Sequence, residues 1–595
     1  MLAFLGPILF SIAALVGLFS RKFSYLILGA SSVIFAATQF ELGDYLSYYS
    51  LIAGTVWFFA SIYSLSYGER YGKWLASLMS LTVLGMSVIL VSDNYLALIV
   101  GWEIMSIPSY AIVAINKYQR EPAFTFMTFS EFSVVLIIAG AISSYVISGN
   151  SSFAFIHLNS FVPLLLISFG SIIKMGMFPF MISEWLPIAH GNAPANASAV
   201  FSATMTLMGV FLITRMVFLT ASSSGSVYIG ILFLIIGSIS ILFASIYAYI
   251  EENMKMLGGF STIENQAAIL SAFGLYLVTN SMILKEFVLV TIIVFSLSHA
   301  LSKTGLFLSI GSSRAEYFGD VRSPEDRWIR IGTLLSTLSL SGLFPAIGGV
   351  AVWMLLESFF MQVYLGGYIG VIAIIVGSII AISEGMATGA MMKVLAFSGL
   401  FRAKKGQASK IETITVFSVG LTLIILFIIS VLFVPAIFRG GIPAVLVFNG
   451  FTLESKFSIA DFGLVSPDYI ILLITVFSLV SYAIFRKPKT RIAEPWDSGL
   501  EISGEYTSFA YANNVRLMLR RLLRTRIGSD NQTVSVVDVF WVAMTVTGRT
   551  YRKFCMFVTR KFMNSSISWY MIYMIVAFMV ILILAVTFYR FLALA

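Results

Sequence analysis

The sequence is poor in the residues that bind metals, form disulfide bonds or cover the surface of a soluble protein. Its 595 residues include one cysteine, three histidines and only 11% charged residues. The single Cys555 excludes a disulfide framework and any cysteine-ligated zinc or iron–sulfur site. His157, His190 and His299 lie far apart in sequence, which argues against a histidine metal centre. We therefore expect no metal site and no cofactor in this chain.

Hydrophobic residues, by contrast, make up 59% of the chain. A soluble fold of this length cannot use so much apolar surface, because its exterior faces water. Apolar runs long enough to cross about 30 Å of hydrocarbon recur from end to end, so the predicted fold class is an all-α polytopic membrane protein with about 16 transmembrane helices. The expected spans are 2–19, 24–40, 46–67, 74–92, 95–115, 123–147, 160–183, 197–219, 226–250, 262–279, 284–311, 330–361, 367–395, 411–438, 468–485 and 569–593.

Basic residues cluster in alternate connections between these spans, while most of the others have no lysine or arginine. Because basic loops stay in the cytoplasm, the loops after odd-numbered spans are expected there, with both termini outside. The predicted location is the cell membrane, in contact with lipid. Much of the net charge of +9 then reflects the basic cytoplasmic loops that orient the protein in the membrane, and we expect no nucleic-acid partner. Residues 494–566 include "NNVRLMLRRLLRTRI", whose apolar and basic residues alternate at helical spacing, as in a segment that lies on the membrane surface or braces a neighbouring subunit.

Two predicted spans are interrupted by proline and glycine. Pro179 lies in "KMGMFPF", and Pro345 lies in "SGLFPAIGGVAVW". A broken backbone ladder at membrane depth is tolerated only inside protein or beside a water-filled cavity. Two such spans in the two halves of a chain are typical of transporters built from inverted repeats, although a packing kink would also explain either one alone.

Ionisable residues also lie inside predicted spans, where a charge costs roughly 3 kcal/mol on insertion scales. Any one of them alone could be a structural ion pair. A set spread over both halves is what a proton relay requires, because each member must gain and lose a proton. A buried lysine near a carboxylate suits this role, because burial favours loss of the lysine proton whereas the carboxylate favours its retention. The residues are Glu103, Glu131, Lys174, His299, Lys303, Glu357, Glu384 and Lys393.

Four stretches resemble successive motifs of the antiporter-like subunits of respiratory complex I, Mrp antiporters and energy-converting hydrogenases. The hydrogenase-4 component B and formate hydrogenlyase membrane subunit type is the most similar. The stretches are "GWEIMSIPSY", "IIKMGMFPFMISEWLPIAHGNAPANASAVFSATM", "MKMLGGFSTIENQ" and "SHALSKTGLFLSIGS". They contain the motif residues His190, Pro194 and Glu264.

The resemblance implies two inverted five-helix repeats with helices 7 and 12 broken. It matches Glu103 to the helix-5 glutamate, Lys174 to the helix-7 lysine and Lys303, one turn after His299, to a helix-10 lysine. Lys393 resembles a further family lysine. The implied divisions are N-terminal helices 1–73, repeats 74–250 and 251–395, core helices 396–493, the amphipathic segment 494–566 and a final transmembrane helix 567–595.

The chain departs from the family pattern in its second half. Val352 stands where the second broken helix usually carries a charge, and Glu357 follows five residues later. The expected function is a proton- or sodium-translocating subunit of a redox-driven respiratory or hydrogenase-type complex. Its partners would be other membrane subunits and, indirectly, iron–sulfur redox subunits. The alternatives are a redox-independent Mrp-type cation/proton antiporter, a membrane subunit for inorganic-carbon uptake, and a scaffold that has lost the relay.

Overall fold

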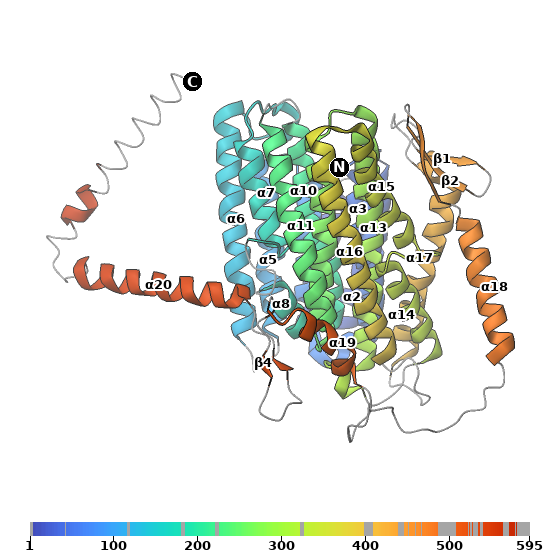
Figure 1. Cartoon of the computed structure of the whole chain (residues 1–595). Helices are drawn as coiled ribbons and strands as arrows, with labels where there is room; N and C mark the ends of the chain where they lie inside the picture. The colour runs from blue at the N-terminus through green and yellow to red at the C-terminus, as the bar shows by residue number, and fades with distance from the viewer. Residues whose placement is uncertain are drawn as a thin grey trace. The chain divides into compact units, whose positions relative to one another are not determined.

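A computed structural model of the chain shows a bundle of long helices (Figure 1). It describes residues 4–520 with gaps at 42, 116–119, 180–184, 221–224, 322–325, 398–407, 438–445, 450–451, 458–459, 466 and 486–506, and parts of 521–579. Residues 1–520 form one compact unit and 521–595 form another.

The helices of the first unit follow the apolar runs of the sequence closely. They are α1 (Leu5–Gly17), α2 (Arg21–Phe40), α3 (Ser47–Tyr67), α4 (Gly72–Val91), α5 (Tyr95–Val113), α6 (Glu121–Ser148), α7 (Val162–Lys174), α8 (Leu186–Asn192), α9 (Ala195–Val200), α10 (Thr206–Leu219), α11 (Ser226–Ile250), α12 (Met254–Val278), α13 (Met282–Ser313), α14 (Arg327–Leu340), α15 (Ile347–Leu365), α16 (Gly367–Phe397), α17 (Lys410–Ile437), α18 (Pro467–Phe485) and α19 (Ser508–Met518). A five-residue π-helical turn, Phe201–Met205, joins α9 to α10.

The helical, multi-pass architecture is confirmed, but the predicted count of about 16 spans is not. Ten helices among the described residues are long and apolar enough to cross a membrane, and α1 and α7 are shorter apolar helices. The helix α12 begins at Met254, eight residues before the predicted span. The predicted final span, 569–593, lies mostly outside the described residues. Within it, residues 571–576 are described and are helical.

The connection after α17 contains a small antiparallel sheet, where the sequence indicated only a long loop. Its strands β1 (Leu446–Asn449), β2 (Thr452–Phe457) and β3 (Ala460–Val465) pair in the order β1-β2-β3, with Leu446 opposite Ser455. The helix α19 ends at Met518, so the amphipathic stretch predicted to continue to Ile527 is helical only in its first part.

The second unit is described separately. It contains α20 (Val539–Phe562), which lies within the predicted amphipathic segment 494–566, and a short strand pair, β4 (Arg526–Ile527) and β5 (Val534–Ser535).

Both predicted helix breaks are present, and they share one geometry. After α7, the N–H of Met177 donates to Ile172 O and that of Gly176 to Ile173 O. After α14, the corresponding bonds run from Leu343 to Leu338 and from Gly342 to Ser339. Each glycine has a positive φ, +75° and +61°, as a helix C-cap of this kind requires. Each break continues into a cis Phe–Pro peptide, at Pro179 and Pro345.

Lys174 and Leu340 occupy equivalent positions in the two breaks, because each residue lies two positions before the capping glycine. The side chain of Val352 packs against the second break, 2.8 Å from where a Cβ on Gly342 would lie. The sequence has no charged residue between Arg330 and Glu357. The two breaks are therefore alike in backbone and different in charge.

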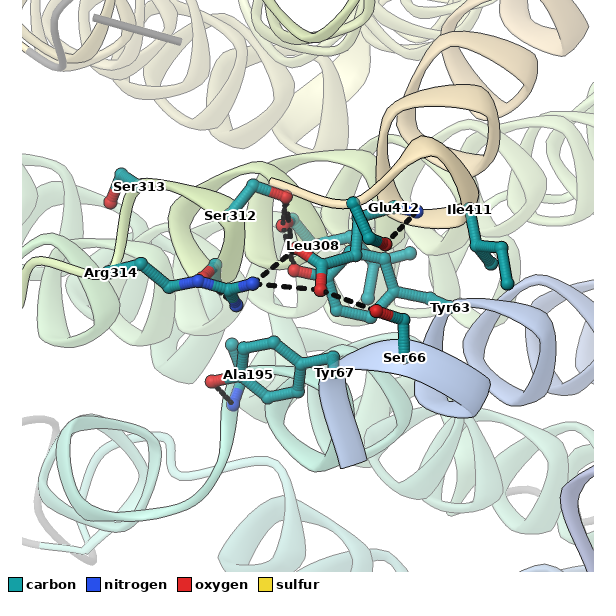
Figure 2. A network of polar contacts seen from close by, with 12 residues as sticks. Tyr63, Ser66, Tyr67, Ala195, Leu308, Ser312, Ser313, Arg314, Ile411 and Glu412 are labelled. Atoms are coloured by element: carbon teal, nitrogen blue, oxygen red, sulfur yellow. Dashed lines mark hydrogen bonds and ion pairs between the residues drawn. The ribbon is translucent and has the colours of Figure 1, made fainter. Parts of the chain in front are cut away.

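A buried ion pair joins three helices at one end of the bundle (Figure 2). Arg314, the C-cap of α13, donates to both carboxylate oxygens of Glu412 on α17 at 2.8 and 2.7 Å. The Glu412 side chain is 1% exposed, and Ser66 on α3 donates to it at 3.2 Å. The Arg314 guanidinium also lies over the ring of Tyr67, 5.3 Å from its centroid. Both bonds to Glu412 come from the one guanidinium nitrogen Nη2, and these charge-assisted contacts fix the ends of α3, α13 and α17.

We expect Arg314→Ala to lower the free energy of unfolding by about 3 kcal/mol, because it leaves the Glu412 charge buried and unpaired. The double change Arg314→Met with Glu412→Met removes both charges and should recover much of that loss. Thermal or denaturant unfolding of the purified protein in detergent measures both effects.

Lys410→Ala is the matched control, since Lys410 is exposed on the first turn of the same α17 helix. It should change stability by less than about 0.5 kcal/mol. A double variant no more stable than Arg314→Ala would show that the ion pair is not what holds these helix ends.

Candidate ion-translocation site

Lys174 is the last residue of α7, and its side chain is completely buried. Its ammonium group donates to Ser106 Oγ on α5 and Ser130 Oγ on α6, both at 3.0 Å. It also lies 5.0 Å from the centroid of the Phe126 ring. Two hydroxyls and an aromatic face replace part of the water that the ammonium loses on burial. The helix break thus ends α7 beside polar groups of α5 and α6.

The carboxylate that the relay hypothesis requires is present near Lys174. Glu103 on α5 and Glu131 on α6 both act on Lys174 electrostatically, and both are half-buried. Neither belongs to an ion pair within 4.0 Å among the described residues. The two acids are therefore close enough to stabilise the ammonium without neutralising it by direct contact.

A second group of buried ionisable residues surrounds α12 and α13. Lys303 on α13 is completely buried, and its ammonium donates to Gly258 O on α12 at 3.1 Å. His299 lies one turn earlier on α13, and Glu264 on α12 interacts electrostatically with Lys303. The predicted span 284–311 lies within α13, and the match of Lys303 to a helix-10 lysine stays a prediction.

Gly258 and Gly259 allow the neighbouring helices to come this close. A Cβ on Gly258 would lie 2.7 Å from the Phe307 ring of α13, and one on Gly259 would lie 2.7 Å from Pro187 Cα of α8. His190 on α8 is stacked on Phe307 with ring centroids 4.9 Å apart. We call Lys174, His190, Glu264, His299 and Lys303 the polar axis.

Three residues of the polar axis are buried without normal hydrogen bonds. Both ring nitrogens of His190 and of His299, and both carboxylate oxygens of Glu264, make no hydrogen bond of good geometry to any described residue. The π-helical turn lies nearby, and its Ser202 shares a 2.6 Å hydrogen bond with Thr262 of α12. Unpaired polar atoms and π-helical turns both tend to occur at functional sites.

The remaining predicted residues are not members of the polar axis. Glu357 is buried on α15, and Pro194 precedes the first residue of α9. Lys393, near the end of α16, forms a 2.8 Å ion pair with Glu252 in the α11–α12 connection. Glu384, on the same helix, interacts electrostatically with Glu264. The sequence marked Glu264 only as a motif residue, because its neighbours lie on helices distant in the chain.

No group of three or more histidine, cysteine, aspartate or glutamate side chains in the described part of the chain has a geometry that would hold a metal ion.

Comparison with known proteins finds a similar family for the part of the chain that contains the polar axis. The membrane domain of the NADH:quinone oxidoreductase/Mrp antiporter family matches residues 92–323, a range that contains the whole polar axis. Proteins similar to this chain include hydrogenase-4 component B, antiporter subunits and subunit N of NADH-quinone oxidoreductase, so the resemblance seen in the motifs is confirmed.

Among the relatives is hydrogenase-4 component B of Escherichia coli, 30% identical over 384 residues, which cover 59% of this chain and 56% of that protein. The chain spans about half the length of the first curated relatives it matches.

Two solved structures share the fold. A chain of an archaeal respiratory complex, the membrane-bound sulfane sulfur reductase, superposes with a TM-score of 0.78 at 15% identity, covering 97% of this chain and 99% of that one. A chain of the Mrp complex from Dietzia superposes with a TM-score of 0.68 at 17% identity, covering 98% and 63%.

The hydroxyls beside Lys174 allow a test of how its charge is held. Ser130→Ala should destabilise the protein by about 1 kcal/mol or more, because it removes a hydrogen bond to a charged group. In a Lys174→Met background the same change should cost much less. A double-mutant cycle, read from unfolding in detergent, measures the difference.

The matched control is Thr125→Ala, five residues earlier on α6, where the hydroxyl donates to Glu121 O of its own helix. It should show no coupling to Lys174. A Ser130–Lys174 coupling indistinguishable from that of Thr125 would contradict the hydrogen-bonding role.

Proposed function

We propose that this chain is the proton- or sodium-translocating subunit of a redox-driven membrane complex. The observation that carries the proposal is Lys174, completely buried at a helix break, with two hydroxyls at 3.0 Å and two carboxylates nearby. Buried lysines inside membrane-spanning bundles are rare, and they mark ion pathways. A lysine whose charge is balanced without a direct ion pair can exchange its proton.

The unpaired atoms of the polar axis support a path beyond Lys174. Buried polar groups in proteins are normally satisfied by protein or by water. His190, Glu264 and His299 lack protein partners of good geometry among the described residues, which favours internal water between them. A chain of water and exchangeable side chains is sufficient to carry a proton between Lys174 and Lys303.

The proposed relay keeps every ionisable residue that the sequence indicated, in two halves. The first half is the Glu103, Glu131 and Lys174 group, and Lys303 with His299 stands at the centre. The second break has no charge, so the second half would depend on groups from α12, α15 and α16. These are Glu264, Glu357, Glu384 and Lys393.

We infer the setting from the family. The family's members are subunits of multi-subunit membrane complexes, so other membrane subunits are the expected direct partners and iron–sulfur redox subunits the indirect ones. The chain itself would perform no bond chemistry. The cell membrane is the proposed location, with both termini outside, in agreement with the distribution of lysine and arginine.

Two other functions each have an observation in their favour. An Mrp-type cation/proton antiporter, without redox coupling, is favoured by the superposition on the Mrp complex chain. A scaffold that has lost the relay is favoured by Val352 and Leu340 at the second break. Gentle solubilisation followed by identification of the co-purifying subunits separates a hydrogenase-type complex from an Mrp-type one.

We expect Lys174→Ala and Glu103→Ala to uncouple ion transfer from redox turnover while the complex still assembles. A proton-transferring group typically contributes about 100-fold or more to its step, so transfer through this subunit should be nearly lost in Lys174→Ala. Proton-to-electron stoichiometry in membrane vesicles measures it.

Lys73→Ala, which removes an exposed lysine outside the polar axis, is the control and should retain the wild-type stoichiometry. Wild-type stoichiometry in Lys174→Ala as well would refute a relay through Lys174 and leave the scaffold.

A further inference from the structure

The helix α19 docks against the ends of α11 and α16, within the first unit of the chain. Tyr511 donates to Gly389 O at 3.1 Å, and its ring stacks on Tyr249 with centroids 5.5 Å apart. Ala512, the next residue, is completely buried. The connection before α12, where Glu252 lies, is on the side that the positive-inside rule assigns to the cytoplasm.

Arg516 is the charged residue that α19 inserts into this junction, and it is 3% exposed. Its guanidinium donates to Ile250 O, to Phe509 O at 2.8 Å and to Glu252 Oε1 at 3.0 Å. It also lies 4.0 Å from the centroid of the Phe509 ring. Because a guanidinium keeps its proton at every physiological pH, Arg516 places a fixed positive charge at this point.

The same oxygen of Glu252 also accepts from Lys393. Lys393 Nζ is 2.8 Å from Glu252 Oε1, and the other carboxylate oxygen of Glu252 accepts from Ser508 of α19. Burial would raise the pKa of Glu252, but Lys393, Ser508 and Arg516 together lower it. One carboxylate therefore serves two cations, one fixed and one able to lose its proton.

In the described part of the chain, few other charged groups lie near Lys393. Its side chain is completely buried, and its ammonium donates to Glu251 O at 2.7 Å and Tyr249 O at 3.3 Å and lies over the Phe318 ring. The carboxylate of Glu251 accepts from the backbone N–H groups of Glu252 and Asn253. Among the residues that the structure describes, the charged groups that act on Lys393 are thus Glu252, Glu251 and Arg516.

We propose that Arg516 is a positioning residue that keeps Lys393 able to release its proton, acting through the shared carboxylate of Glu252. A lysine alone with a buried carboxylate would be held as a tight ion pair. A second, permanent cation on that carboxylate weakens this hold and leaves Glu252 paired after Lys393 becomes neutral. The proton passes from Lys393 Nζ to water, and the lysine regains one from the relay. The proposal rests on the proposed function, in which Lys393 is a relay residue.

The experiment compares variants of the intact complex in membrane vesicles by following ion transfer across a range of pH. Arg516→Gln keeps a side chain able to hydrogen-bond to the carbonyls but removes the charge. We expect it to move the pH profile upward by about one unit, the effect of losing a like charge within a few ångströms. Arg516→Lys should restore the wild-type profile.

Ser508→Ala distinguishes an effect of the Arg516 charge from an effect of attaching α19 to Glu252. It removes a contact that holds α19 to Glu252 and leaves both cations in place, so its profile should not move. Arg520→Ala, which removes an exposed arginine on the same segment, is the control for net charge. An unshifted profile for Arg516→Gln, or an equal shift for Ser508→Ala, would overturn the proposal and leave Arg516 as an attachment residue.

Glu252→Gln keeps the proposal testable if Arg516→Gln does not assemble. It removes the shared carboxylate, so Lys393 should release its proton more readily and the profile should move downward. No shift would overturn the proposal. Lys174→Ala in the same vesicles tests the relay itself: if it abolishes transfer while the Arg516 and Glu252 variants match wild type, only the inference about Arg516 fails.

Discussion

An ammonium group inside a membrane-spanning bundle must be held by polar groups that the bundle itself supplies, and the rest of this structure follows from that constraint. Burying the charge of Lys174 costs roughly 3 kcal/mol on insertion scales. Ser106, Ser130, Glu103 and Glu131 offset that cost from two other helices. The break after α7 gives the lysine a helix end beside these groups. Three helices are thereby fixed in register around one side chain.

The helix breaks in the two halves of the bundle share one backbone geometry but differ in charge. Both breaks have the same pair of cap hydrogen bonds and the same positive-φ glycine. Only the first carries an ionisable residue, whereas Leu340 and Val352 line the second. Ionisable groups in the second half come instead from α12 and α16, where Glu264 interacts with Lys303 and with Glu384. The halves are thus related in shape without being equivalent in chemistry.

The role of a residue could be predicted from the sequence when that role depends on the neighbouring chain, and not when it depends on a partner from a distant helix. The breaks at Pro179 and Pro345 could be predicted because proline and glycine act on their own backbone. Lys174 could be singled out because a charge in an apolar run is costly wherever it packs. Ser106 and Ser130 could not, because a serine in a membrane helix is common and its partner lies 68 and 44 residues away. Arg516 was one basic residue among many in an amphipathic stretch, and only the docking of α19 distinguishes it.

Composition and local pattern by themselves determined that the chain is a helical membrane protein, where its helices break, and which charges are buried at a cost. These properties depend on hydropathy and backbone chemistry, which act over one or two helical turns. The tertiary structure alone decided which buried charges meet: Lys174 with two serines, Lys303 with Glu264, and Lys393 with Glu252 and Arg516. Such pairings depend on how close the helices approach one another, and small residues such as Gly258 and Gly259 control that approach from positions far away in the sequence.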